Sequence, residues 1–244
     1  GRVVLYQHYG TVEKRSNRVI EAVRDGDVWR ETRVLIDNIP GHPLYNGGRV
    51  AFGPDGMLYI TTGWTENRER PQDLGSLAGK ILRLTPNGAV PGDNPYPGSP
   101  VWSLGHRNPQ GIAWDKAGEL YAAEHGQSGN DEFNLIVAGA NYGWPLIEGS
   151  ETRDGLRAPI AHSGSRTWAP SGLTSDGRRL LLAGLKSGGI IALVPRSNEP
   201  VLAFPMEDRM RDVLVIDGTV HAITTNRSPR RNGTSSDRLV RFIP

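Results

Sequence analysis

The chain has 244 residues, of which 37% are hydrophobic, and its formal net charge is +2. This length allows one large domain or two small ones, and the hydrophobic content is sufficient for a core. The small net charge gives no reason to expect nucleic-acid binding, and no stretch approaches the roughly eighteen apolar residues of a membrane-spanning helix. The absence of cysteine excludes disulfide bonds and thiolate metal sites.

Two apolar stretches near the N-terminus, residues 3–6 and 18–23, predict strands. A step of strand, glycine turn and strand then recurs along the chain, at residues 50–62, 112–123, 173–183 and 213–223. A further apolar run follows each of these steps, at residues 80–84, 133–137, 189–194 and 238–243. Such short runs bounded by Gly, Pro, Asn and Asp favour strands over helices.

Small sheets of three or four strands, repeated about every 40 to 60 residues, are typical of a β-propeller. We therefore predict an all-β chain that forms a single propeller domain over residues 1–244. The two N-terminal stretches match the second and third strands of a repeat unit. The chain is thus expected to begin within a blade and to hold about one partial and four fuller blades.

Most of the candidate binding and metal-ligating residues lie between residues 105 and 145. The segment GHRNPQG, residues 105–111, places the guanidinium of Arg107 and the amide of Asn108 between glycines, which suits an anion. Further on, Asp131 and Glu132 supply carboxylates beside glycines, and the turn NYGWP at residues 141–145 exposes backbone carbonyls; both are oxygen ligands that calcium prefers. Each motif alone is also typical of an ordinary surface turn.

Taken in order, the motifs GHRNPQG, EHG, DEFNLI and NYGWP resemble those of the soluble quinoprotein sugar dehydrogenases, the glucose/sorbosone dehydrogenase family. Members use pyrroloquinoline quinone (PQQ) and calcium. The resemblance extends over nearly the whole chain and implies a six-bladed propeller whose N-terminal portion is missing here. It implies that an aldose is oxidised at its anomeric carbon to a lactone, with electrons passed to an external acceptor. It also implies a periplasmic or secreted location, although the chain shows no signal-peptide pattern.

The resemblance also implies roles for individual residues. PQQ would be bound by basic and polar side chains and covered by an aromatic one, namely Arg107, Asn108, Lys186, Arg209, Arg211 and Trp168. Gly126 and Gln127 would offer backbone carbonyls to the calcium ion that contacts PQQ, although the family usually has proline at the second position. Glu132 and Tyr142 match a second calcium site. Several fixed cations are what a tricarboxylate quinone needs.

The position of the family's histidine base holds a different residue. In the segment PLYNGGR, residues 43–49, Tyr45 stands two residues before Gly-Gly-Arg, and His42 lies three residues earlier. A phenol with an ordinary pKa near 10 is a poor base at neutral pH, whereas imidazole is well matched. A second departure is Trp64, where the family more often has aspartate. Either Tyr45 or His42 therefore stands where the base belongs.

These departures leave two other functions open. A propeller that kept its scaffold without the histidine could bind a sugar, a quinone or a protein partner without turnover. A calcium-dependent lactonase-type propeller would need carboxylates that converge on the channel. The basic residues predicted there favour the dehydrogenase over the lactonase.

Overall fold

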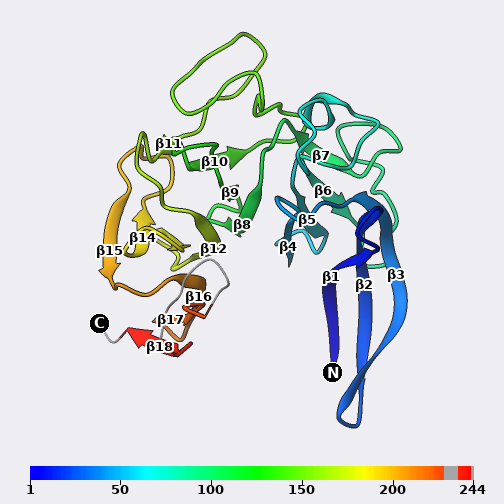
Figure 1. Cartoon of the computed structure of the whole chain (residues 1–244), viewed down its shortest axis with the longest axis horizontal. Coiled ribbons are helices and arrows are strands. Elements are labelled where there is room, and N and C mark those ends of the chain that lie inside the picture. The colour runs from blue at the N-terminus through cyan, green and yellow to red at the C-terminus, as the bar shows by residue number, and fades with distance from the viewer. Residues whose placement is uncertain (228–235, 243–244) are drawn as a thin grey trace. The chain divides into compact units, whose positions relative to one another are not determined.

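The computed structural model describes residues 1–227 and 236–242 (Figure 1). Within these ranges the chain forms five antiparallel sheets and one short 3-10 helix, η1 (Arg70–Gln72). No helix in the described part of the chain is long and apolar enough to cross a membrane. The sheets of three or four strands confirm the predicted all-β, propeller-type fold class.

The chain divides into two compact units. Unit 1 comprises Gly1–Asn108, Val137–Ile147 and Arg153–Arg157, and unit 2 comprises Pro109–Ile136, Glu148–Thr152 and Ala158–Pro244. The first sheet of unit 1 has the order β1 (Arg2–Gly10), β2 (Arg15–Asp25), β3 (Val28–Pro40). Its second sheet has the order β4 (Gly47–Phe52), β5 (Leu58–Thr62), β6 (Lys80–Leu84), β7 (Val101–Leu104).

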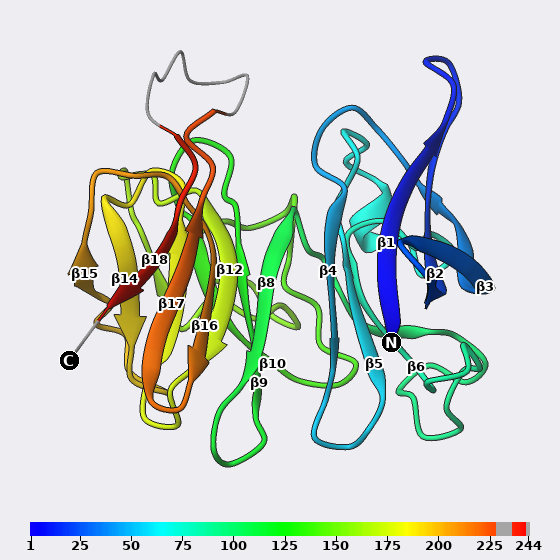
Figure 2. The ribbon, with the colours of Figure 1, turned by 90° about the horizontal axis from the view of Figure 1, so that it is seen from below.

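Unit 2 contains the other three sheets. They consist of β8 (Pro109–Trp114), β9 (Leu120–Glu124), β10 (Glu132–Ile136) and β11 (Ala161–His162); of β12 (Pro170–Ser175), β13 (Leu180–Gly184), β14 (Gly189–Leu193) and β15 (Val201–Pro205); and of β16 (Met210–Ile216), β17 (Thr219–Thr224) and β18 (Leu239–Phe242). The first strands of these sheets, β8, β12 and β16, pack on one another in that order (Figure 2). Successive blades of a propeller pack in this way.

The four predicted strand–turn–strand steps are confirmed as the hairpins β4–β5, β8–β9, β12–β13 and β16–β17. Their turns need glycine: Gly56 and Gly118, for example, have φ values of +74° and +81°, which side chains with a Cβ rarely adopt. The predicted strand at residues 238–243 corresponds to β18, which ends at Phe242; residue 243 lies outside the described residues.

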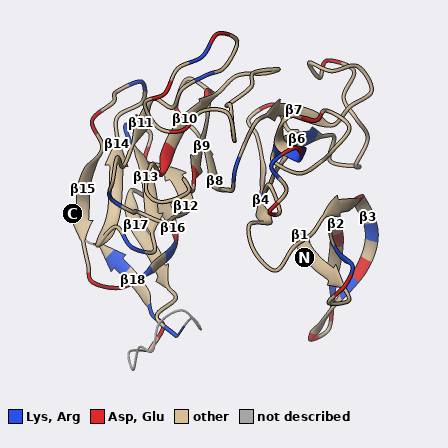
Figure 3. Cartoon of the chain, turned by 45° about the horizontal axis from the view of Figure 1, so that its top comes forward, with Lys and Arg blue, Asp and Glu red and all other residues tan. Residues whose placement is uncertain are grey.

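The outer strands β3, β7, β11 and β15 were not predicted individually. β11 has only two residues, and β3 is largely exposed and carries charges of both signs along its length (Figure 3). β3 forms an edge of its sheet. Charged side chains on an edge strand oppose pairing with other chains, and they also hide the apolar alternation by which a strand is recognised.

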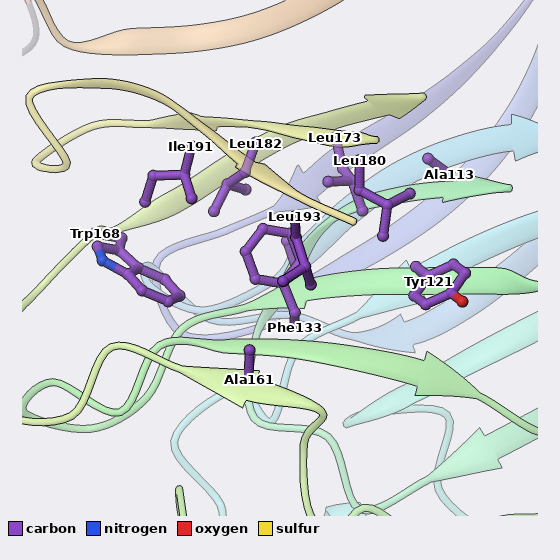
Figure 4. Close-up of a cluster of buried hydrophobic side chains, with 11 residues drawn as sticks. Ala113, Tyr121, Phe133, Ala161, Trp168, Leu173, Leu180, Leu182, Ile191 and Leu193 are labelled. Atoms are coloured by element: carbon purple, nitrogen blue, oxygen red, sulfur yellow. The ribbon is translucent and has the colours of Figure 1, made fainter. Parts of the chain in front are cut away.

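Strand β13 shows why the sequences of the central strands are continuous apolar runs. Leu180 and Leu182 point into one buried cluster, together with Phe133 and Trp168 (Figure 4). Leu181 points to the opposite face, into a second cluster that receives residues of β16 and β17. Because side chains alternate across a strand, a sheet that is covered on both faces needs apolar residues at every position.

Replacing Leu182 with alanine is expected to lower the free energy of unfolding by about 3 kcal/mol, because the side chain is fully buried and leaves a cavity. Urea unfolding followed by tryptophan fluorescence measures the effect, since Trp168 belongs to the same cluster. The matched control is Leu214→Ala in β16, whose side chain is 55% exposed. Equal loss of stability in both variants would contradict this account of the core.

Candidate functional site

Arg107 of unit 1 lies in a cage of aromatic rings. Its Cζ is 4.7 Å from the ring centroid of Tyr45, 5.2 Å from that of Trp144 and 5.7 Å from that of Trp64. The residue is only 5% exposed. A guanidinium over the face of an aromatic ring gains about 0.5 to 2 kcal/mol, more when it is desolvated. The cage therefore fixes the position of one permanent positive charge.

The loops that carry Tyr45, Trp64 and Arg107 meet closely in this cage. The N–H of Trp64 donates to the carbonyl of Arg107 at 2.8 Å, and the Oδ1 of Asn108 accepts the N–H of Gly47 at 3.0 Å. A Cβ on Gly63 would lie 1.9 Å from the carbonyl oxygen of Tyr45, so only glycine is accommodated there. Tyr45 itself has a φ of +59°. Such strain in a residue with a side chain is often found at functional sites.

His42 is held by two contacts in the same unit. Its Nδ1 accepts the N–H of Leu44 at 3.2 Å, and its Nε2 lies 3.6 Å from a carboxylate oxygen of Glu66. Accepting at Nδ1 favours the tautomer that carries the proton on Nε2, on the side of the ring that faces Glu66. To act as a base, His42 would have to release one of these contacts.

Tyr142, also in unit 1, is buried against His106. The two rings are stacked with centroids 4.7 Å apart, and the hydroxyl of Tyr142 accepts the N–H of Val137 at 2.9 Å. His106 in turn contacts the hydroxyl of Ser103 at 2.8 Å. The predicted calcium role of Tyr142 concerns its carbonyl oxygen, whereas these contacts involve its side chain.

In unit 2 the backbone hydrogen bonds bring several predicted residues together. Asp131 accepts the N–H of Gly126 at 3.1 Å and that of Trp168 at 2.6 Å. The carbonyl of Trp168 then accepts the N–H of Lys186 at 2.9 Å. The predicted metal loop and two of the predicted PQQ-binding residues are thus neighbours in one network.

The remaining residues predicted in unit 2 lie around this network. A guanidinium nitrogen of Arg209 donates to the carbonyl of Leu185 at 3.4 Å. Arg211 has an exposed side chain, and its carbonyl accepts the hydroxyl of Ser171 at 2.6 Å. Gln127 is exposed, and its N–H donates to a carboxylate oxygen of Glu148 at 2.8 Å.

Two carboxylates face each other across β9 and β10. Glu132 pairs with Glu124 in the strand register, and burial together with the charge of Glu124 raises the pKa of Glu132 to about 8. Its oxygens accept the N–H of Gly149 at 3.0 Å and the side-chain amide of Asn134 at 3.1 Å. A bound cation would relieve the repulsion between the two carboxylates. Across residues 1–227 and 236–242, however, no three His, Asp or Glu residues are arranged to hold a metal.

Sequence reasoning missed three features of these sites. Trp144 was read only as part of a turn, although its ring covers Arg107. Asp131 was expected to be an oxygen ligand, but its carboxylate accepts backbone N–H groups. Lys80 was read as a strand residue, yet its buried ammonium donates to three carbonyls. A lysine within an apolar run was the one available signal, because lysine is seldom fully buried without partners.

Comparisons with known proteins agree on one group of enzymes. A family model described as Glucose / Sorbosone dehydrogenase matches residues 2–231. Aldose sugar dehydrogenase YliI of Escherichia coli is 44% identical over 125 residues, which cover 47% of this chain and 33% of YliI. Quinoprotein glucose dehydrogenase B of Acinetobacter calcoaceticus is 36% identical over 143 residues, which cover 50% of this chain and 30% of that protein.

A solved structure gives the same result for the fold. The PQQ-bound form of an aldose sugar dehydrogenase from Streptomyces coelicolor superimposes with a TM-score of 0.88 at 35% sequence identity. The match covers 98% of this chain and 74% of that one. The chain thus spans about a third of the length of the two curated relatives and about three quarters of this structural neighbour.

Proposed function

Because the chain belongs to the glucose/sorbosone dehydrogenase family, we propose that it binds PQQ and calcium and oxidises an aldose at its anomeric carbon. The observation that carries this proposal is the aromatic cage that holds the charge of Arg107 in a buried position. A rigid guanidinium can bind a carboxylate or quinone oxygen with two parallel hydrogen bonds. Because Arg107 is already ordered, it loses little conformational entropy when the ligand binds.

In chemical type, the predicted residues suit a polyanionic quinone and a calcium ion. The cofactor would be bound by the charges and amides of Arg107, Asn108, Lys186, Arg209 and Arg211. Trp168, which the resemblance assigns as its cover, is 6% exposed, and its ring packs against Phe133 in the buried cluster of unit 2. Backbone carbonyls of Gly126 and Gln127 would bind the calcium ion at the cofactor, since exposed loop carbonyls are typical calcium ligands. The raised pKa of Glu132 indicates a carboxylate that a cation would stabilise in its charged form, as expected for a second calcium site with Tyr142.

PQQ supplies the chemistry of the reaction when bound, because its quinone accepts a hydride from the anomeric carbon. The chain must then accept the proton of the anomeric hydroxyl. Tyr45 and His42 are the candidates, and both lie in the loop that precedes β4. Positive charge close to the quinone would stabilise the negative charge that develops on its oxygens. The product would be a lactone, and an external acceptor would remove the electrons in a periplasmic or extracellular location.

A second candidate function is binding of a sugar or quinone without turnover. It is favoured by Tyr45, which stands at the position of the expected base and packs its ring against Arg107. In that arrangement the cation cage would be kept while the proton acceptor is lost. The two candidates share the same binding residues and differ only in the chemical step.

Adding PQQ and Ca²⁺ to the purified chain and following dye reduction with a series of aldoses tests both candidates. Dye reduction that depends on aldose, PQQ and Ca²⁺ supports the dehydrogenase. A change in the visible spectrum of PQQ without dye reduction supports the binding function. A chain that neither reduces dye nor alters the PQQ spectrum would contradict both.

A further inference from the structure

Asp131 precedes β10 and is 2% exposed. One carboxylate oxygen accepts the N–H of Gly126 at 3.1 Å. The other oxygen accepts two N–H groups, from Trp168 at 2.6 Å and from Ala169 at 2.8 Å. Hydrogen bonds to an ionised carboxylate are about twice as strong as neutral ones. A single side chain therefore connects the loop after β9 with the segment before β12.

The backbone around Asp131 is fixed independently. Its N–H donates to the hydroxyl of Ser163 at 2.9 Å, and its carbonyl accepts the N–H of Ser163 at 2.8 Å. The carboxylate thus points from a rigid support. Loss of the carboxylate's hydrogen bonds would therefore release the two connected segments and leave the backbone of Asp131 in place.

The segment at Trp168 contains a strained residue, which the hydrogen bonds to the Asp131 carboxylate stabilise. Ala169 has a φ of +50°, which is unfavourable for a residue with a Cβ. The carbonyls of Trp168 and Ala169 accept the N–H groups of Lys186 at 2.9 Å and Leu185 at 3.0 Å. The hydrogen bonds of Asp131 therefore hold a strained turn to which the backbone of Lys186 is attached.

We propose that Asp131 is a positioning residue that couples calcium binding at the loop of Gly126 and Gln127 to PQQ binding at the segment of Trp168 and Lys186. The inference rests on the proposed function for the identity of the two ligands. Both oxygens of Asp131 are engaged with N–H donors, so it acts on the ligands through backbone that it orients. Ordering of either segment orders the other, and by linkage each ligand raises the affinity of the other by the same factor.

The test uses Asp131→Asn with Asp176→Asn as the matched control. Asp176 also accepts two backbone N–H groups, from Arg178 at 2.8 Å and Arg179 at 2.6 Å, but in the turn between β12 and β13. Calorimetry measures the affinity for Ca²⁺ with and without saturating PQQ, and the reverse titration serves as a check. In the wild type and the control, saturating PQQ is expected to raise the affinity for Ca²⁺ by a large factor, and in Asp131→Asn this coupling factor is expected to be about fivefold smaller, because only the direct contact between the two ligands remains.

The coupling factor separates positioning from general destabilisation, because a structural defect alone would weaken both affinities and keep their ratio. Wild-type coupling that survives in Asp131→Asn overturns the inference and leaves the proposed function standing. A wild type that binds neither ligand overturns both.

A measurement on the wild type covers the case in which the variant does not fold. Hydrogen–deuterium exchange with and without Ca²⁺ alone reports on residues 125–127 and 166–170. We expect Ca²⁺ to slow exchange in both segments, although they are far apart in the sequence. Slowing confined to residues 125–127 would overturn the inference while confirming that calcium binds.

Discussion

Arg107→Met is expected to weaken PQQ binding by about 100-fold or more, because two charge-assisted hydrogen bonds contribute roughly 3 kcal/mol or more. Methionine retains an unbranched apolar stem that can still contact the rings of Tyr45 and Trp144, so the cage should persist without its charge. Titration of PQQ followed by its visible spectrum measures the affinity. Urea unfolding of the same preparation checks that the variant remains folded.

Two companion variants sharpen the interpretation. Arg68 also lies over the ring of Trp144, with its Cζ 5.2 Å from the centroid, but its side chain is exposed. Arg68→Met should leave the affinity for PQQ within about threefold of the wild type, because an exposed cation is screened by solvent. Arg107→Lys keeps the charge and loses the planar fork, so an intermediate loss of about tenfold is expected. If Arg68→Met and Arg107→Met weakened PQQ binding equally, a general effect of positive charge would replace the specific role of Arg107.

The four hairpins could be predicted from the sequence because their determinants are local. Alternating apolar residues and a glycine at a positive φ lie within about a dozen residues of one another. The outer strands depend on more distant partners. β11, for example, pairs with β10 through only two residues after a long connection, so no local pattern marks it.

The functional residues also divide into those marked by a local sequence pattern and those whose contacts come from distant segments. The GHRNPQG motif predicts a role for Arg107, because the motif is contiguous. Its aromatic cage comes from three separate segments, and nothing local to Tyr45, Trp64 or Trp144 indicates that their rings face one guanidinium. Asp131 was recognised as chemically significant but was assigned the role of a ligand, since an acidic residue beside glycine looks the same whether it binds a cation or backbone N–H groups. The sequence reveals which residues carry charge, and the tertiary structure decides what that charge contacts.

Lys80 of β6 is linked to the aromatic cage through a chain of hydrogen bonds. Its side chain is fully buried, and its Nζ donates to the carbonyls of Arg70 at 2.7 Å, Ala78 at 2.8 Å and Pro71 at 3.1 Å. Arg70 and Pro71 belong to η1, which ends at Gln72. The side-chain amide of Gln72 donates to the carbonyl of Trp144 at 2.7 Å. Lys80 therefore supports one wall of the cage through η1.

Lys80→Met is expected to lower the free energy of unfolding by about 3 kcal/mol near pH 6, where Lys80 is an ammonium group, since it removes three hydrogen bonds from buried carbonyls. The side chains are similar in length, so little cavity is created. Urea unfolding measures the change, and Lys116→Met, at an exposed position in the turn after β8, is the matched control. A control that lost as much stability as Lys80→Met would contradict the role of the buried contacts.

The stabilising effect of Lys80 should also depend on pH. Burial lowers the pKa of Lys80 to about 7, an effect that the charge of Asp73 partly opposes, whereas lysine in the unfolded chain keeps a pKa of about 10.4. Between these values the unfolded state binds more protons at this position than the folded state, so the stability of the wild type rises with pH. Below about pH 7 both states are protonated and the contribution is constant. The difference in unfolding free energy between the wild type and Lys80→Met should therefore grow by up to about 2 kcal/mol from about pH 7 to about pH 9. A difference that stays the same over this range would mean that the three carbonyls, which match the three N–H donors of an ammonium group, keep Lys80 charged throughout.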